Sequence, residues 1–132
     1  MSRTRIGITG ASGRMGRMLI EATLNDQEMA LGALFEQPGN PFLGKTAGDL
    51  TGLASDITVG DDLAAGLKNI DCLIDFTRPA GALAHLELCR QAGVGIVIGT
   101  TGFEAEGKAA IAAAAKEIPV VFASNMAVGV NL

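Results

Sequence analysis

The sequence has no tryptophan and no tyrosine, and its 132 residues include one histidine and two cysteines. Without a Cys-x-x-Cys spacing or a histidine cluster, no metal site is expected, and Cys72 and Cys89 are interpreted as buried free thiols. The net charge of −4 and the lack of a dense basic patch argue against nucleic acid as a partner. No apolar run is long enough to span a membrane. The first strand begins too early to leave room for a signal peptide, so we expect a cytoplasmic location without membrane partners.

Glycine, alanine and aliphatic residues are abundant instead, in a chain long enough for one domain. Apolar runs alternate with helical segments. Strands are predicted at 5–9, 29–35, 57–59, 72–75, 95–98 and 120–123. Helices are predicted at 15–24, 61–67, 81–92 and 105–117, and a long loop rich in Pro and Gly at 37–56. Continuously apolar strands indicate a sheet covered on both faces. The pattern predicts a doubly wound, mainly parallel α/β sheet of the Rossmann type.

The most informative motif is Gly10-Ala11-Ser12-Gly13-Arg14-Met15-Gly16, which joins the first predicted strand to the first predicted helix. In this context Gly10 suits a tight turn, Gly13 lets backbone approach a pyrophosphate, and Gly16 lets the helix pack close to the strand. The helix start then presents free N–H groups to phosphate oxygens. The spacing differs from the commoner G-x-G-x-x-G, and a purely structural glycine turn remains an alternative.

An acidic residue follows at the position that a dinucleotide site requires. Glu36 ends the second predicted strand, about twenty residues after Gly16. Its carboxylate is suited to accept hydrogen bonds from both hydroxyls of the adenosine ribose. Gln37 stands where an Arg usually recognises a 2′-phosphate, so NADH is expected to bind at least as well as NADPH. Arg14 is interpreted either as a pyrophosphate ligand or as an ordinary surface residue.

Small and polar residues follow three later strands. Phe76 and Thr77 follow the fourth, 99–102 the fifth and 123–126 the sixth. The carboxyl ends of parallel strands form the ligand crevice of such folds, so these segments are expected to line it. Taken singly, each could be an ordinary turn. His85 lies inside a predicted helix, away from the strand ends, and is interpreted as a structural residue.

These segments together resemble the N-terminal domain of the 4-hydroxy-tetrahydrodipicolinate reductase family of lysine and diaminopimelate biosynthesis. The resemblance rests on the glycine motif and on Asp75-Phe76-Thr77-Arg78-Pro79, Val97-Ile98-Gly99-Thr100-Thr101-Gly102-Phe103 and Asn125-Met126-Ala127-Val128-Gly129-Val130-Asn131. It implies hydride transfer from NADH or NADPH to a cyclic dicarboxylic acid, in a homotetramer assembled through a C-terminal substrate domain. The residues predicted to bind the cofactor are Gly10, Ala11, Ser12, Gly13, Arg14, Met15, Gly16, Glu36, Gln37, Phe76, Thr77, Arg78, Gly81, Gly99, Thr100, Thr101, Ala123, Ser124, Asn125 and Met126.

The resemblance also implies that Thr101 lies near the substrate. Residues 1–126 are expected to form the dinucleotide-binding domain, and residues 127–132 the hinge and the start of a truncated substrate and oligomerisation domain. The family's catalytic histidines, its lysine and its carboxylate-binding motif are expected beyond Leu132. No catalytic residue is therefore expected within the chain, which should bind cofactor without turnover.

The alternative from another class is a non-enzymatic Rossmann-type nucleotide-binding or sensing module. The segments Gly99-Thr100-Thr101-Gly102 and Asp75-Phe76-Thr77-Arg78-Pro79 argue against it, because a sensor needs no crevice on the nicotinamide side. Among enzymes, a short-chain reductase needs a Tyr-x-x-x-Lys pair, and the chain has no tyrosine. A semialdehyde dehydrogenase needs a reactive cysteine, whereas both cysteines lie in apolar runs.

Overall fold

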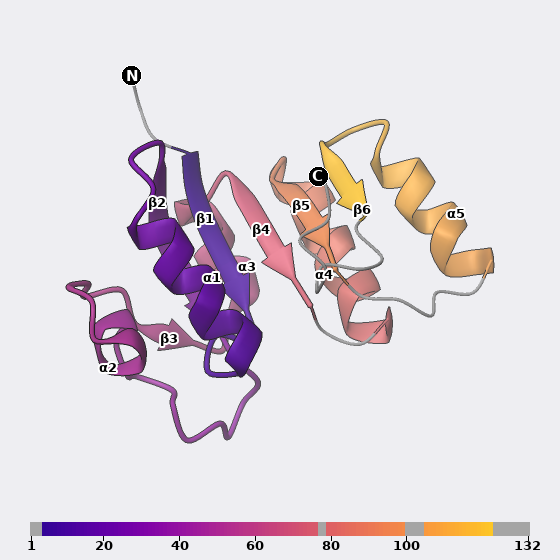
Figure 1. Ribbon diagram of the computed structural model, residues 1–132. Helices are drawn as coiled ribbons and strands as arrows, with labels where there is room; N and C mark the ends of the chain where they lie inside the picture. Colours follow the sequence, from indigo (N-terminus) through magenta and orange to yellow (C-terminus); the bar gives the residue numbers. More distant parts are fainter. Residues whose placement is uncertain (1–3, 77–78, 100–104, 123–132) are drawn as a thin grey trace.

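A single six-stranded parallel sheet organises the chain (Figure 1). The structure, a computed structural model, describes residues 4–76, 79–99 and 105–122. The strands are β1 (Thr4–Thr9), β2 (Met29–Phe35), β3 (Val59–Gly60), β4 (Cys72–Asp75), β5 (Gly95–Ile98) and β6 (Val120–Phe122). Their order is β3-β2-β1-β4-β5-β6, and every neighbouring pair is parallel. This order is that of the doubly wound dinucleotide-binding sheet, so the predicted fold class is confirmed.

Helices cover the sheet as two layers. They are α1 (Arg14–Leu24), α2 (Ala47–Thr51), α3 (Leu63–Gly66), the short 3₁₀ helix η1 (Leu67–Asn69), α4 (Pro79–Ala92) and α5 (Ala105–Ala114). Ile20 of α1 and Leu50 of α2 share one buried apolar cluster with Ile8. Leu86 of α4 and Ala114 of α5 share a second cluster with Ile96. The two clusters are the cores of the two faces, which is why the strands are apolar on both sides.

The register between β1 and β4 is held at both ends by polar contacts. At the outer end, the guanidinium of Arg5 donates to Asp71 across 3.1 Å, and the backbone N–H of Arg5 donates to the same carboxylate at 2.8 Å. At the other end, the hydroxyl of Thr9 donates to Asp75 at 3.2 Å. Residues in each of these pairs are 66 positions apart in the sequence. A slip of the strand by one residue would break both contacts and turn its apolar side chains to the wrong face.

The structure differs from the sequence expectations in several places, among them the end of α5 at Ala114 rather than at residue 117. The predicted loop at 37–56 contains α2, which begins with a capping box between Thr46 and Asp49. The third strand is Val59–Gly60 rather than 57–59, and the helix predicted at 61–67 is divided between α3 and η1. Helix α4 begins at Pro79, two residues before the expected start. No helix in the described ranges has the length and apolar composition needed to cross a membrane.

Candidate functional site

A cavity of about 690 Å³ lies at the carboxyl ends of β1, β2 and β4. Its wall contains nine residues predicted from the sequence: Gly10, Gly13, Arg14, Met15, Gly16, Glu36, Gln37, Phe76 and Gly81. Thr9, Phe35 and His85 also line it and were not predicted to do so. The strand order places β1 between β2 and β4, so the glycine loop lies between the Glu36 side and the Phe76 side of the cavity.

The glycine loop has the geometry of a phosphate cradle. Gly10 has a φ of +63°, which makes the tight exit from β1. A Cβ on Gly16 would lie 2.2 Å from the carbonyl oxygen of Gly10, so only glycine allows α1 to start this close to the strand. Gly13 forms the N-cap of α1 without a side-chain hydrogen bond. The first-turn N–H groups of α1 have no partner within the helix and face the region where an anion is favoured.

Glu36 is tied to this loop. Its carboxylate oxygen accepts the backbone N–H of Ser12 at 2.9 Å and the hydroxyl of Ser12 at 2.5 Å. The second strand therefore delivers its terminal carboxylate to the loop, as the twenty-residue spacing predicts. The carboxylate is partly buried, and a ribose hydroxyl could replace the serine hydroxyl as its donor. The Ser12 contact itself carries no signal in the sequence.

Arg17 connects the glycine loop to the long segment after β2. Its Nε donates to the carbonyl oxygen of Ser12 at 3.0 Å. Its guanidinium carbon also lies 5.2 Å from the centre of the Phe42 ring, a cation–π contact. One side chain of α1 thus supports both the loop and the segment beside it.

His85 lies at the opposite side of the cavity and is joined to a buried carboxylate. Its Nδ1 lies 2.6 Å from Asp75, which is 0% exposed, while the His85 side chain is 25% exposed. The interpretation of His85 as remote from the strand ends is wrong. Gly81 and His85 fall in the first two turns of α4, one turn apart on the same face. The spacing Gly-x-x-x-His at the start of the helix that follows β4 was the signal in the sequence.

The remaining predicted residues are placed as follows. Ala11 is fully buried, and its backbone N–H donates to the carbonyl of Phe35 at 3.2 Å, so it anchors the loop from below the cavity wall. Gly99 packs against Phe76, since a Cβ there would lie 2.0 Å from the ring. The other predicted residues, Thr77, Arg78, Thr100, Thr101, Ala123, Ser124, Asn125 and Met126, lie outside the described residues.

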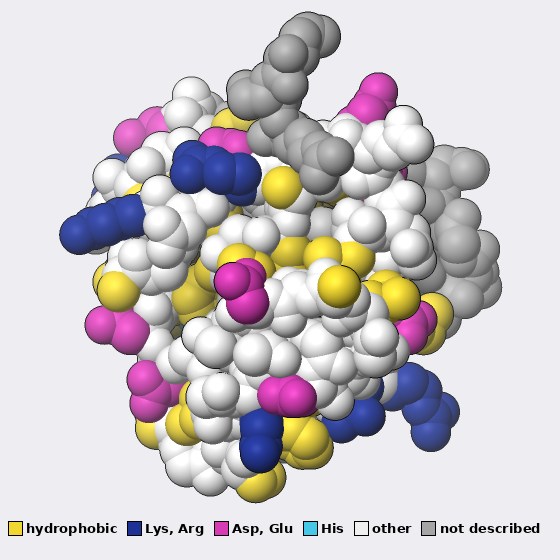
Figure 2. All heavy atoms as spheres, turned by 90° about the vertical axis from the view of Figure 1, so that its left-hand side faces the viewer, with side chains coloured by type: hydrophobic (Ala, Val, Ile, Leu, Met, Phe, Trp, Pro, Cys, Tyr) yellow, Lys and Arg dark blue, Asp and Glu magenta, His cyan; other side chains and the backbone are white. Residues whose placement is uncertain are grey.

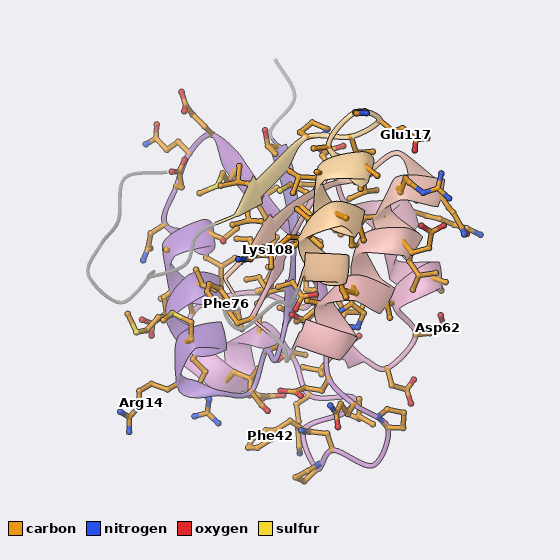
Figure 3. The ribbon with its side chains drawn as sticks, turned by 90° about the vertical axis from the view of Figure 1, so that its right-hand side faces the viewer. Arg14, Phe42, Asp62, Phe76, Lys108 and Glu117 are labelled. Carbon is orange, nitrogen blue, oxygen red and sulfur yellow. The ribbon has the colours of Figure 1, made fainter. Side chains whose placement is uncertain are left out.

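The charges near the cavity are mixed. Arg14 projects from the start of α1 away from the body of the domain, while Phe76 lies inside it (Figure 3). Glu36 and Asp61 line the same cavity as Arg14. On the face that Figure 2 shows, Lys and Arg side chains are scattered among Asp and Glu rather than gathered into one patch. Arg14 is the one Lys or Arg among the described residues that line the cavity, so the glycine loop would hold an anion mainly through backbone N–H groups.

Neither cysteine has the properties of a nucleophile. Burial, followed by the charge of Asp75, raises the pKa of Cys89 to about 12. Burial also raises the pKa of Cys72, which is only partly buried. A thiolate is the reactive form of cysteine, so both side chains are suited to packing rather than catalysis.

The fold, the glycine loop and the acidic end of β2 define the class of the chain as a Rossmann-type domain of the dinucleotide-binding kind. The family model described as "Dihydrodipicolinate reductase, N-terminus" matches residues 4–126, and the chain belongs to this family. The resemblance stated from the sequence is thereby confirmed.

Individual relatives agree with the family match. The chain is 75% identical to 4-hydroxy-tetrahydrodipicolinate reductase of Dechloromonas aromatica, over all of the chain and 49% of that relative. It is 59% identical to the enzyme of the same name from Aromatoleum aromaticum, over 96% of the chain and 46% of the relative. A dipicolinate-bound dihydrodipicolinate reductase from Paenisporosarcina matches with a TM-score of 0.76 and 29% identity, over 96% of the chain and 49% of that structure. The chain thus spans about half the length of the curated relatives it matches.

Proposed function

We propose that the chain binds NADH or NADPH as the cofactor domain of a reductase of lysine and diaminopimelate biosynthesis. The reduced nicotinamide supplies the hydride, and the acceptor is a cyclic dicarboxylic acid derived from 4-hydroxy-tetrahydrodipicolinate. The family match and the names of the relatives support this reaction over a nucleotide-sensing module. The observation that carries the proposal is the single cavity lined by both Glu36 and the glycine loop.

The proposed roles follow the wall of that cavity. Gly10 to Gly16 and the N-terminus of α1 hold the pyrophosphate through backbone N–H groups, whose partial charges favour the anion. Glu36 accepts hydrogen bonds from the adenosine ribose, replacing at least the hydroxyl of Ser12. Phe76 and Gly81 lie beside the rest of the cofactor. Gly99, together with Arg78, Thr100, Thr101 and 123–126 outside the described ranges, is proposed to complete the nicotinamide side.

The cofactor choice follows from the charges at the end of β2. A 2′-phosphate placed near Glu36 would meet a carboxylate, and Gln37 offers an amide in place of a guanidinium. We expect NADH to bind at least as well as NADPH for this reason.

The remaining proposals concern the longer protein. Residues 1–126 form the cofactor domain, and 127–132 lead into a substrate and oligomerisation domain. The chain alone binds cofactor without turnover, because the family's catalytic and carboxylate-binding residues lie outside it. The longer protein is proposed to be a cytoplasmic homotetramer.

Titration calorimetry with NADH and with NADPH tests the cofactor proposal. Glu36→Ala is expected to weaken NADH binding about tenfold, since charge-assisted hydrogen bonds are worth about 1.5–3 kcal/mol. Glu21→Ala, on an exposed position of α1, is the matched control and should bind like the unsubstituted chain. Binding of neither nucleotide would overturn the proposal, and a tenfold preference for NADPH would overturn the cofactor choice. Oxidation of NADH above background with enzymatically generated substrate would contradict the expected lack of turnover.

A further inference from the structure

The pair of Asp75 and His85 stands apart from every residue assigned a role so far. We infer that His85 contacts the second nucleotide half of the bound cofactor through its Nε2, and that Asp75 is the positioning residue that holds the imidazole in place. This inference rests on the proposed cofactor binding and names the group that recognises the ribose on the nicotinamide side.

Both carboxylate oxygens of Asp75 have hydrogen-bond partners. It ends β4, is 0% exposed, and accepts the hydroxyl of Thr9 at 3.2 Å on one oxygen and His85 Nδ1 at 2.6 Å on the other. Burying a carboxylate costs free energy unless hydrogen bonds compensate for the lost water. The side chain of Asp75 is therefore fixed by the sheet, and it fixes the imidazole ring in turn.

This contact determines which nitrogen of His85 is available. A carboxylate accepts a hydrogen bond and cannot donate one, so Nδ1 carries the proton that points at Asp75. Nε2 is the remaining polar atom of the ring, and His85 lines the cavity with a quarter of its side chain exposed. In the neutral ring Nε2 is an acceptor, which suits a hydroxyl donor.

The place of His85 in the sheet decides which part of the cofactor it meets. Glu36 lies at the end of β2, and Asp75 ends β4, on the other side of β1. A dinucleotide crosses such a sheet at this point, with the adenosine over the β2 side and its pyrophosphate at the first helix. Gly81, one turn before His85, lines the same wall as Phe76. The hydroxyl that reaches Nε2 therefore belongs to the second ribose, and ADP lacks that ribose.

Two substitutions of His85 distinguish contact with the cofactor from a purely structural hydrogen bond to Asp75. The amide nitrogen of His85→Asn lies close to the position of Nδ1 and retains the contact with Asp75. The longer amide of His85→Gln reaches the position of Nε2. We expect His85→Asn to weaken NADH binding about tenfold, the effect of one lost hydrogen bond of about 1.4 kcal/mol. His85→Gln should stay within about threefold of the unsubstituted chain.

The test measures NADH and ADP binding by titration calorimetry, together with the fluorescence of bound NADH. ADP affinity should be unchanged in both His85 variants, while Glu36→Ala weakens ADP and NADH alike. Asp75→Asn should reduce NADH affinity and not ADP affinity, with circular dichroism showing a folded chain.

Equal NADH affinity in the Asn and Gln variants of His85, or equal losses for NADH and ADP, would overturn the inference. If the unsubstituted chain bound ADP and not NADH, the inference would fail while the phosphate cradle stood. If it bound neither, the proposed function itself would fail.

Discussion

Two carboxylates stand at the ends of the strands on either side of β1, and they are held in different ways. Glu36 at the end of β2 is partly buried and takes both of its hydrogen bonds from Ser12 in the adjoining loop. Asp75 at the end of β4 is wholly buried and takes its bonds from β1 and α4, two elements of the packed core. The partners of Glu36 can be exchanged for ligand or water, whereas those of Asp75 belong to the fold.

The comparison shows how burial suits one chemical group to two different proposed roles. A partly solvated carboxylate can accept a ligand hydroxyl at little cost, because water and serine already compete for it. A fully buried carboxylate cannot lose a partner without a desolvation penalty, so its value lies in orienting another group. Burial, rather than residue type, distinguishes the proposed ligand-binding acid from the proposed positioning acid.

The largest effect is expected from Asp75→Ala. The substitution leaves Thr9 and His85 without their shared acceptor, which costs about 1–3 kcal/mol of unfolding free energy for each of the two lost contacts. Urea unfolding followed by circular dichroism measures this loss. Asp71→Ala at the exposed end of the same strand pair, where the Arg5 and Asp71 side chains are 49% and 47% exposed, is the control and should lose far less. Similar losses in the two variants would contradict the distinction.

An intermediate effect on the free energy of unfolding is expected when the hydroxyl that donates to each carboxylate is removed. Thr9→Val removes a donor from buried Asp75 and should cost about 1–3 kcal/mol. Ser12→Ala removes a donor from Glu36, where water can take its place, and should cost at most about 1 kcal/mol. Denaturant midpoints at constant slope give both values, with exposed Thr58→Val as the reference. A greater loss of stability for Ser12→Ala than for Thr9→Val would contradict the view that the partner of Asp75, and not that of Glu36, belongs to the fold.

The smallest effect is expected on the pKa of the Cys89 thiol, which the charge of Asp75 influences. Burial is the main cause that raises its pKa to about 12, and the charge of Asp75 is the second. In a Cys72→Ala background, Asp75→Asn should lower the pKa of Cys89 while leaving it above the ordinary value of 9.0. Thiolate absorbance against pH measures this. Because the folded pKa is raised, the thiol's contribution to stability is complete below about 9 and is lost as pH rises towards 12. An unchanged thiol pKa would show that the charge of Asp75 does not reach Cys89.

The sequence predicted the sheet well where strands are apolar on both faces. The bounds of β2, β4 and β5 agree with the predicted ranges, because short, mainly apolar runs bounded by polar or turn residues have few alternatives. Helix α2 was missed because five residues in a Pro- and Gly-rich stretch give no apolar period. Its one signal was the capping pair Thr46 and Asp49, with Asp in place of the usual Glu or Gln.

The site was predictable where it depends on local chain geometry. Glycine spacing and the distance to Glu36 are properties of one strand, one turn and one helix, and they placed that carboxylate at the loop correctly. The His85 contact was not predictable in the same way, because it joins the second turn of α4 to a strand end through a buried partner.

The long sequence separation between β1 and β4 affects the order in which the strands of the domain pair during folding. Thr9 meets Asp75 across 66 residues, whereas β1 can pair with β2 as soon as the intervening helix has formed. Closing the longer loop carries a larger entropic cost, which delays that pairing in folding. During synthesis, the Thr9–Asp75 contact beside the cavity can therefore form only after β4 has emerged from the ribosome.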